Sequence, residues 1–221
     1  MERVARRNRA YDPWVRRSPT LGKLVAVTVV PALLAVVGLF HPTGLDPSTA
    51  HMWAMMHIWL LPVFPLLTLG LIVPLWGRPV RGAAGVATVV AWLGAAVFAA
   101  LYTGLDAVAG IAAGTVQSHA AEGQDVRQSI AALFETADAM GHAGVQALAV
   151  AVVAASAVLA GRHGWRVLPG TAVLLVCTYE FYDSHIFYPR GVLTMVGFAV
   201  GFALLNWPAV HRPAAAPAPG E

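Results

Sequence analysis

The chain has 221 residues, of which 58% are hydrophobic and 11% are charged, and its mean hydropathy is +0.67. In a soluble globular domain about 25% of the residues are charged, so this composition predicts an integral membrane protein and excludes a soluble one. The formal net charge is +3. Because the basic residues flank apolar stretches, we assign this charge to membrane topology and expect no nucleic-acid partner.

Six apolar stretches follow one another along the chain. Each is long enough, or nearly so, to cross about 30 Å of hydrocarbon as a helix; they cover residues 24–40, 52–76, 82–105, 139–161, 167–188 and 191–210. Their apolarity is continuous rather than alternating, which favours helices over strands. The sequence therefore predicts an all-α, polytopic membrane protein, a six-transmembrane-helix bundle that forms one domain over residues 24–210.

The basic residues set the expected orientation. Of the 14, 12 fall on one side of the predicted membrane: Arg3, Arg6, Arg7, Arg9, Arg16, Arg17, Lys23, Arg78, Arg81, Arg162, Arg166 and Arg212. By the positive-inside rule both termini are cytoplasmic, and we expect a bacterial plasma membrane. The basic N-terminal segment 1–23 is long for a cleaved signal peptide, so we expect an uncleaved first helix. The Ala- and Pro-rich tail 211–221 is expected to be a disordered cytoplasmic segment.

Most acids and histidines lie on the outer side of this predicted membrane. Two outer loops hold six of them, which we expect to be solvated: His41, Asp46, His51, His119, Glu122 and Asp125. His57, Asp106 and Glu180 fall at membrane depth instead. Ionisable groups there are costly and usually face the bundle interior, where a partner or a pathway offsets the loss of hydration.

The stretch FETADAMGH places Glu135, Asp138 and His142 at i, i+3 and i+7, on one face of a helix. This polar stripe begins before the fourth apolar stretch and runs into it, and the third stretch remains compatible with a helix through Val116. We therefore expect helices three and four to project beyond the outer membrane surface. The stripe either solvates this projection or converges with the other outer polar groups on a shared site.

A second group of polar side chains lies in EFYDSHIFYPRG, at the end of the fifth stretch. Glu180 and Asp183 are one helical turn apart, with Tyr182 and His185 close by in sequence. Arg190 follows, where a guanidinium could pair with a carboxylate or hold an anionic substrate group. The alternative is an interfacial aromatic belt with a snorkelling arginine.

The stretch HMWAMMHIW opens the second apolar run with three methionines between His51 and His57. Thioether and imidazole ligands suit copper. Helical spacing, however, divides this set between faces, so we expect the methionines to pack and retain only His57 as a site residue.

These residues permit metal chemistry or metal-free acid–base chemistry. His57, His142 and His185 are the candidate metal ligands, and with the nearby carboxylates they would suit zinc, iron, manganese or copper. Haem would need two facing histidines and is less expected beside carboxylates. The candidate catalytic acids and bases are Glu135, Asp138, Glu180, Asp183 and Asp106. Arg190, Tyr102 and Tyr182 are the candidate substrate-binding residues.

The predicted function is that of a membrane enzyme with an outward-facing acid and histidine pocket, acting on a lipophilic substrate. Two alternatives remain open: a proton-coupled or metal-ion transporter or metal-handling protein, and a membrane subunit whose polar face binds a partner protein. The lipid bilayer is the expected partner. Gly197 and Gly201 form a GxxxG pair, which predicts either close packing within the bundle or the seam of a homo-oligomer.

Overall fold

The computed structural model describes residues 18–76 and 81–210, and every element in these two ranges is a helix. The expected all-α class is therefore confirmed. Most of the predicted basic segment 1–23 and the predicted disordered tail 211–221 lie outside the described residues. The elements are α1 (Ser18–Gly38), α2 (Ala50–Leu60), η1 (Phe64–Thr68), α3 (Leu69–Leu75), α4 (Gly82–Leu105), η2 (Asp106–Ala112), α5 (Ala113–Ser118), α6 (Arg127–His163), η3 (Gly164–Val167), α7 (Leu168–Ser184) and α8 (Arg190–Val210).

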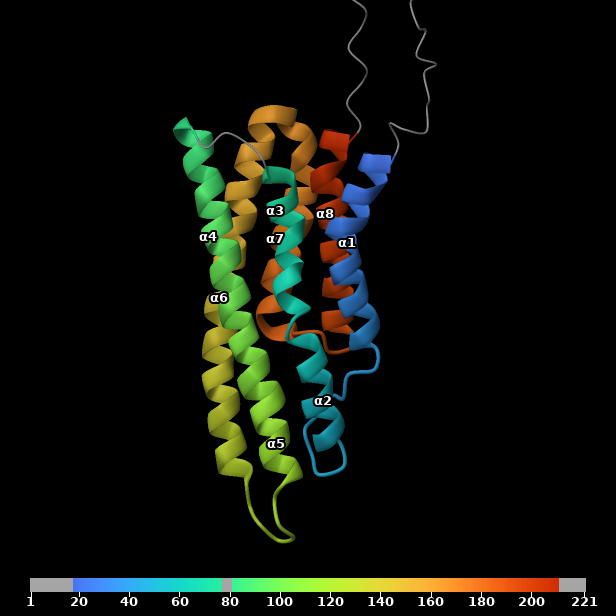
Figure 1. The fold of residues 1–221 in the computed structure, drawn as a ribbon, viewed down its shortest axis with the longest axis vertical. Helices are drawn as coiled ribbons and strands as arrows, with labels where there is room; N and C mark the ends of the chain where they lie inside the picture. Colours follow the sequence, from blue (N-terminus) through green and yellow to red (C-terminus); the bar gives the residue numbers. More distant parts are fainter. Residues whose placement is uncertain (1–17, 77–80, 211–221) are drawn as a thin grey trace, which may run out of the picture.

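The helices form two regions along the long axis of the molecule (Figure 1). In the main bundle, α1, α3, α7 and α8 lie beside α4 and the second part of α6. Below it, in the view of Figure 1, an extension contains α2, η2, α5 and the first part of α6. The 37 residues of α6 span about 55 Å, whereas the 21 residues of α8 span about 31 Å. The long helices therefore project well beyond the short ones.

Four helical segments of the described chain are long and apolar enough to cross a membrane: Leu21–Gly38, Gly82–Ser118, Arg127–Ser184 and Arg190–Pro208. The bent pair Ala50–Leu60 and Phe64–Leu75 makes a fifth if it counts as one span. The segment Arg127–Ser184 comprises two helices, because Gly164, with φ +63°, ends α6 and the chain turns back as α7 alongside it.

The second predicted stretch, residues 52–76, is not one continuous helix. It bends by 43° between α2 and η1. Pro62 and Pro65 lie at this bend, and proline has no backbone N–H with which to continue a helical ladder. The Thr68 hydroxyl donates to the Pro65 carbonyl at 2.7 Å within η1. As a result α2 packs on η2 and α5 in the extension, while α3 belongs to the main bundle.

Aromatic side chains fill the centre of the main bundle. Fully buried rings contact one another within and between the helices; they are Phe64, Phe98, Tyr102, Phe181, Phe198 and Phe202. Gly197 and Gly201 lie against Cys177 and Leu174 of α7, with no room for a Cβ atom. The predicted GxxxG pair therefore forms a seam within the chain.

Candidate metal centre and its cavity

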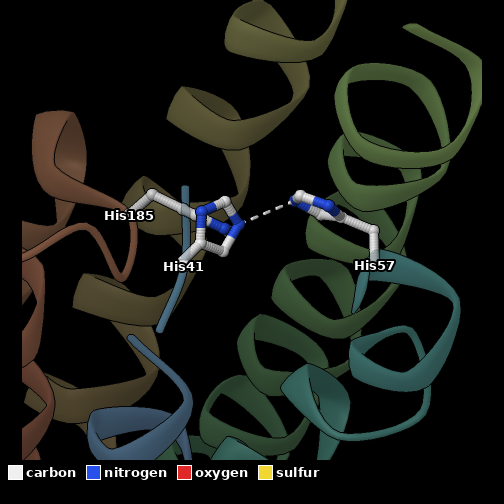
Figure 2. A group of neighbouring side chains, drawn as sticks. All are labelled: His41, His57 and His185. Carbon is white, nitrogen blue, oxygen red and sulfur yellow. Dashed lines mark hydrogen bonds between the residues drawn. The ribbon is translucent and has the colours of Figure 1, made fainter. Parts of the chain in front are cut away.

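Three histidines meet where the main bundle joins the extension (Figure 2). His41 lies in the loop after α1, His57 lies in α2, and His185 directly follows α7. One ring nitrogen from each lies within 4.8 Å of the others, and no further group of three such ligand residues is found among the described residues. His41 and His57 are 5% and 2% exposed. We call this set the three-histidine cluster.

The tautomers of His41 and His57 are fixed by backbone carbonyls. His41 Nδ1–H donates to the Pro42 carbonyl at 2.8 Å, and His57 Nδ1–H donates to the Trp53 carbonyl at 2.8 Å. Burial lowers the pKa of His41 to about 4, so its ring is neutral at neutral pH. In the neutral form of each ring this leaves the lone pair on Nε2, and the two Nε2 atoms face each other at 3.4 Å (Figure 2). A hydrogen bond between these two nitrogens, as drawn in Figure 2, requires that one of the rings also carries a proton on Nε2.

His185 presents a third unsatisfied nitrogen. Its Nδ1 lies 2.8 Å from the hydroxyl of Tyr102, while its Nε2 is buried and has no hydrogen-bond partner among the described residues. The backbone of His185 has φ +43°, a left-handed conformation that is uncommon for residues other than glycine. Such conformations persist where the surroundings enforce them, and they concentrate at functional sites.

The spacing of His41 and His57 fits two ligands of one transition-metal ion. Two nitrogens bound at about 2.0–2.1 Å to one tetrahedral ion lie roughly 3.3–3.4 Å apart, and the Nε2 atoms of His41 and His57 are 3.4 Å apart. Metal-binding histidines usually anchor the second ring nitrogen on a carbonyl, carboxylate or other polar group. All three rings here have such an anchor, on Pro42, Trp53 and Tyr102.

The π-helix η2 supports the cluster from the side of α4. Gly110 in η2 packs directly against the His57 ring, which occupies the space that a Cβ atom would need. The Ala109 carbonyl, also in η2, accepts a hydrogen bond of 2.9 Å from the Trp53 indole N–H. π-Helical turns are rare and often occur at functional sites. Here the turn brings α2 close enough to fix both Trp53 and His57.

A cavity of about 260 Å³ opens beside the cluster, bounded by α2, α4, η2, α6 and α7. Aromatic side chains make up much of its wall. Of the site residues predicted from sequence, seven line this cavity: His57, Tyr102, Asp138, His142, Tyr182, Asp183 and His185.

His142 lies across the cavity as part of a second group. Its ring stacks on Tyr182, with ring centroids 4.0 Å apart and planes 4° from parallel. Its Nε2 atom lies 3.7 Å from Asp183 Oδ1. His142 is therefore not part of the three-histidine cluster. The third ring in that cluster belongs to His41, which the sequence analysis assigned to a solvated loop.

That assignment is wrong for His41, whose side chain is buried. The other five loop residues, namely Asp46, His51, His119, Glu122 and Asp125, are exposed as expected. One sequence signal could have identified His41: it follows the first apolar stretch and precedes Pro42, a position that disfavours helix. The helix therefore stops at the depth of His57 and His185, and the ring can turn inward.

Four predicted site residues lie outside the cavity wall. Glu135 is exposed on the projecting part of α6. Glu180 accepts a 2.6 Å hydrogen bond from Arg190 Nε on the protein surface, so this arginine neutralises a carboxylate of its own chain. Asp106 is fully buried at the start of η2, and neither carboxylate oxygen has a hydrogen-bond partner in the described structure.

Comparison of the chain with protein-family models, with curated proteins and with solved structures finds no significant match. Any function must therefore be argued from the chemistry of the site itself.

Proposed function

We propose that the protein is a multi-pass membrane metalloenzyme whose three-histidine cluster binds one transition-metal ion and whose cavity receives a lipophilic substrate. In this proposal α1, α2 with α3, α4 with α5, α6, α7 and α8 make six passes, and the extension projects on the outer side.

Exposed aromatic side chains at the two ends of the main bundle support this placement. Trp76, Trp165 and Trp207 are exposed near the ends of α3 and α8 and in the turn between α6 and α7. Tyr188 and Phe40 are exposed at the opposite end, near the three-histidine cluster. Aromatic residues are enriched at both membrane interfaces, so the metal centre would lie near the outer interface.

The charges of the described residues support the orientation. Arg81, Arg162 and Arg166 lie at the same end as Trp76 and Trp165, which suits the cytoplasmic side. Polar residues dominate the tip of the extension, from His119 to Gln128. This tip would stand in water.

The observation that carries the metal assignment is the approach of the His41 and His57 Nε2 atoms to 3.4 Å, in one cluster with His185, whose buried Nε2 atom has no hydrogen-bond partner among the described residues. An imidazole-only ligand set suits zinc, copper, iron or nickel, and it is less suited to manganese. Three histidines would leave a coordination position for water or substrate, as in catalytic zinc sites. A bound ion would polarise a substrate oxygen or lower the pKa of a coordinated water.

The chain's own groups would then bind the substrate and move protons. Trp53, Phe134 and Phe187 give the cavity apolar walls and limit access of bulk water. His142 and Asp183 stand on the α6 and α7 side, where His142 can exchange a proton with a bound substrate and Asp183 can stabilise its charged form. Asp138, one turn before His142, is a second proton-transfer group on the same wall.

The direct test is elemental analysis of the full chain, purified in mild detergent without a histidine tag. We expect close to one transition-metal ion per chain, which His41→Ala and His57→Ala each remove. His51→Ala is the matched control, because His51 lies on the same helix as His57 but is exposed. A metal content that stays near zero after reconstitution, or that survives both cluster variants, contradicts the proposal.

Copper handling is a second candidate function, favoured by the methionines of α2. Contrary to the expected division between faces, Met52, Met55 and Met56 line one apolar groove between α1 and α2. Thioethers bind Cu(I), and this groove lies on the helix that carries His57. If the protein handles copper, the double variant Met52→Ile, Met55→Ile should lower Cu(I) uptake into the three-histidine cluster but leave zinc binding unchanged. Competition with a chromogenic chelator measures both.

A further inference from the structure

A groove of about 350 Å³ runs between α6 and α7 on the surface of the main bundle. Val145, Gln146 and Ala149 line it from α6, and Leu175, Thr178, Tyr179 and Tyr182 line it from α7. The groove exists because α6 packs mainly on α4, while α7 packs mainly on α8, so the seam between α6 and α7 is comparatively open.

The groove adjoins the cavity beside the three-histidine cluster. Val145 and Tyr182 line both hollows. The stack of Tyr182 on His142 therefore forms part of the partition between them. Tyr182 is 37% exposed, so this partition is a surface side chain and not a fixed part of the core.

We propose that the α6–α7 groove holds the hydrocarbon chain of a membrane-dissolved substrate whose polar head lies in the cavity. This inference rests on the proposed function and names its substrate class: a single-chain amphiphile that reaches the site laterally, from the outer leaflet of the bilayer. The chain lies along α7 from Tyr182 to Leu175, a distance of about 10 Å, and the head passes the Tyr182–His142 partition.

The side chains that line the groove suit a hydrocarbon chain, and those that line the cavity suit a polar head. Its lining is predominantly apolar, with Thr178 already donating its hydroxyl to the Leu174 carbonyl at 2.7 Å. The cavity beyond the partition presents His142 and Asp183 instead. A hydrocarbon chain that moves from the bilayer into a protein groove gains packing contacts but no hydrophobic transfer energy. Specificity would therefore come from the head group, while the groove orders the chain.

Photo-crosslinking in lipid nanodiscs tests the inference. The probe is dodecanohydroxamic acid with a diazirine at the chain end, because a hydroxamate head binds transition metals, and an excess of unmodified dodecanohydroxamic acid is the competitor. With metal-loaded protein we expect competable labelling concentrated on the α7 segment 175–182. Ala149→Phe, which fills the groove, should reduce this labelling at least fivefold. The matched control Ala157→Phe carries the same change on an exposed position of α6 outside the groove and should leave it unchanged.

A second variant, Leu175→Trp, obstructs the groove from α7 and should have the same effect as Ala149→Phe, which guards against misfolding of one variant. Labelling spread over all lipid-facing helices, or insensitive to both groove variants, overturns the groove as a chain site and indicates ordinary annular lipid. If labelling is confined to the groove but the protein binds no metal, the groove stands and the proposed metalloenzyme fails. If the protein binds the metal but the labelling is diffuse, the proposed metalloenzyme stands and the groove as a chain site fails.

Discussion

The three-histidine cluster and the polar stripe of α6 both contain ionisable side chains, and they lie at the same end of the main bundle, yet their environments differ. In the cluster, each ring is held at one nitrogen by a carbonyl or a hydroxyl, and one nitrogen of each ring lies within 4.8 Å of the others. In the stripe, Glu135 and Asp138 are exposed, and His142 makes a loose contact with Asp183. Fixed, buried and unsatisfied nitrogens indicate a ligand site, whereas the exposed carboxylate of Glu135, outside the cavity, needs only water.

Of the changes considered, Gly110→Ala should have the largest effect on the three-histidine cluster. The added methyl group would overlap the His57 ring, so α2 must shift and the cluster loses its geometry. We expect metal affinity to fall by more than about 100-fold and the free energy of unfolding to fall by about 1–3 kcal/mol. Gly161→Ala is the control, since nothing lies within 4 Å of its Cβ position in α6. Titration calorimetry and thermal melting measure the two effects, and equal results for both variants would disprove the packing argument.

Removal of the metal should have the second-largest effect, on the stability of the folded protein. A ligand that binds only the folded protein stabilises it by about 4 kcal/mol when its free concentration is 1,000 times its Kd. Chelation should therefore lower the melting temperature of the wild-type protein by several degrees. It should leave His57→Ala unchanged, because that variant has no complete cluster. The same shift in both proteins would show that the chelator acts elsewhere.

Tyr102→Phe should weaken the site without dismantling it. The substitution removes the hydroxyl that contacts His185 Nδ1 at 2.8 Å, and loss of such a supporting contact typically costs 10–100-fold in metal affinity. The control is Tyr179→Phe, because Tyr179 is exposed and outside the cavity. If competition with a metal chelator gives the same affinity for Tyr102→Phe as for the wild type, the hydroxyl does not orient His185.

The smallest effect is expected for Glu135→Gln, which alters a solvated residue of the stripe. Metal content should not change, and the free energy of unfolding should move by less than about 0.5 kcal/mol. Affinity purification adds a further readout: loss of a co-purifying protein from Glu135→Gln, with metal content intact, would favour the partner-binding subunit considered in the sequence analysis.

Much of this arrangement can be predicted from the sequence. Continuous apolar stretches predict the helices, and the stripe through Glu135 and Asp138 predicts the long projection of α6. The break within residues 52–76 could have been placed at Pro62 and Pro65, but the packing of α2 on η2 depends on Gly110 and on the π-turn, for which the sequence has no clear signal. Helical periodicity relates residues on one helix, so it grouped His142 with Asp138. It could not bring His41 to His185, because that contact depends on how the loops after α1 and α7 fold inward.

The order of the ligands along the chain has a consequence for biosynthesis. His41 lies in the loop between α1 and α2, and His57 lies in α2, whereas His185 follows α7, late in the described part of the chain. A nascent chain that ends before α7 therefore carries two of the three histidines and the Trp53 and Pro42 carbonyls that orient them, but not His185. Under the proposed function, metal loading would then mark chains that extend at least to His185, and a product truncated before that residue would lack the ion.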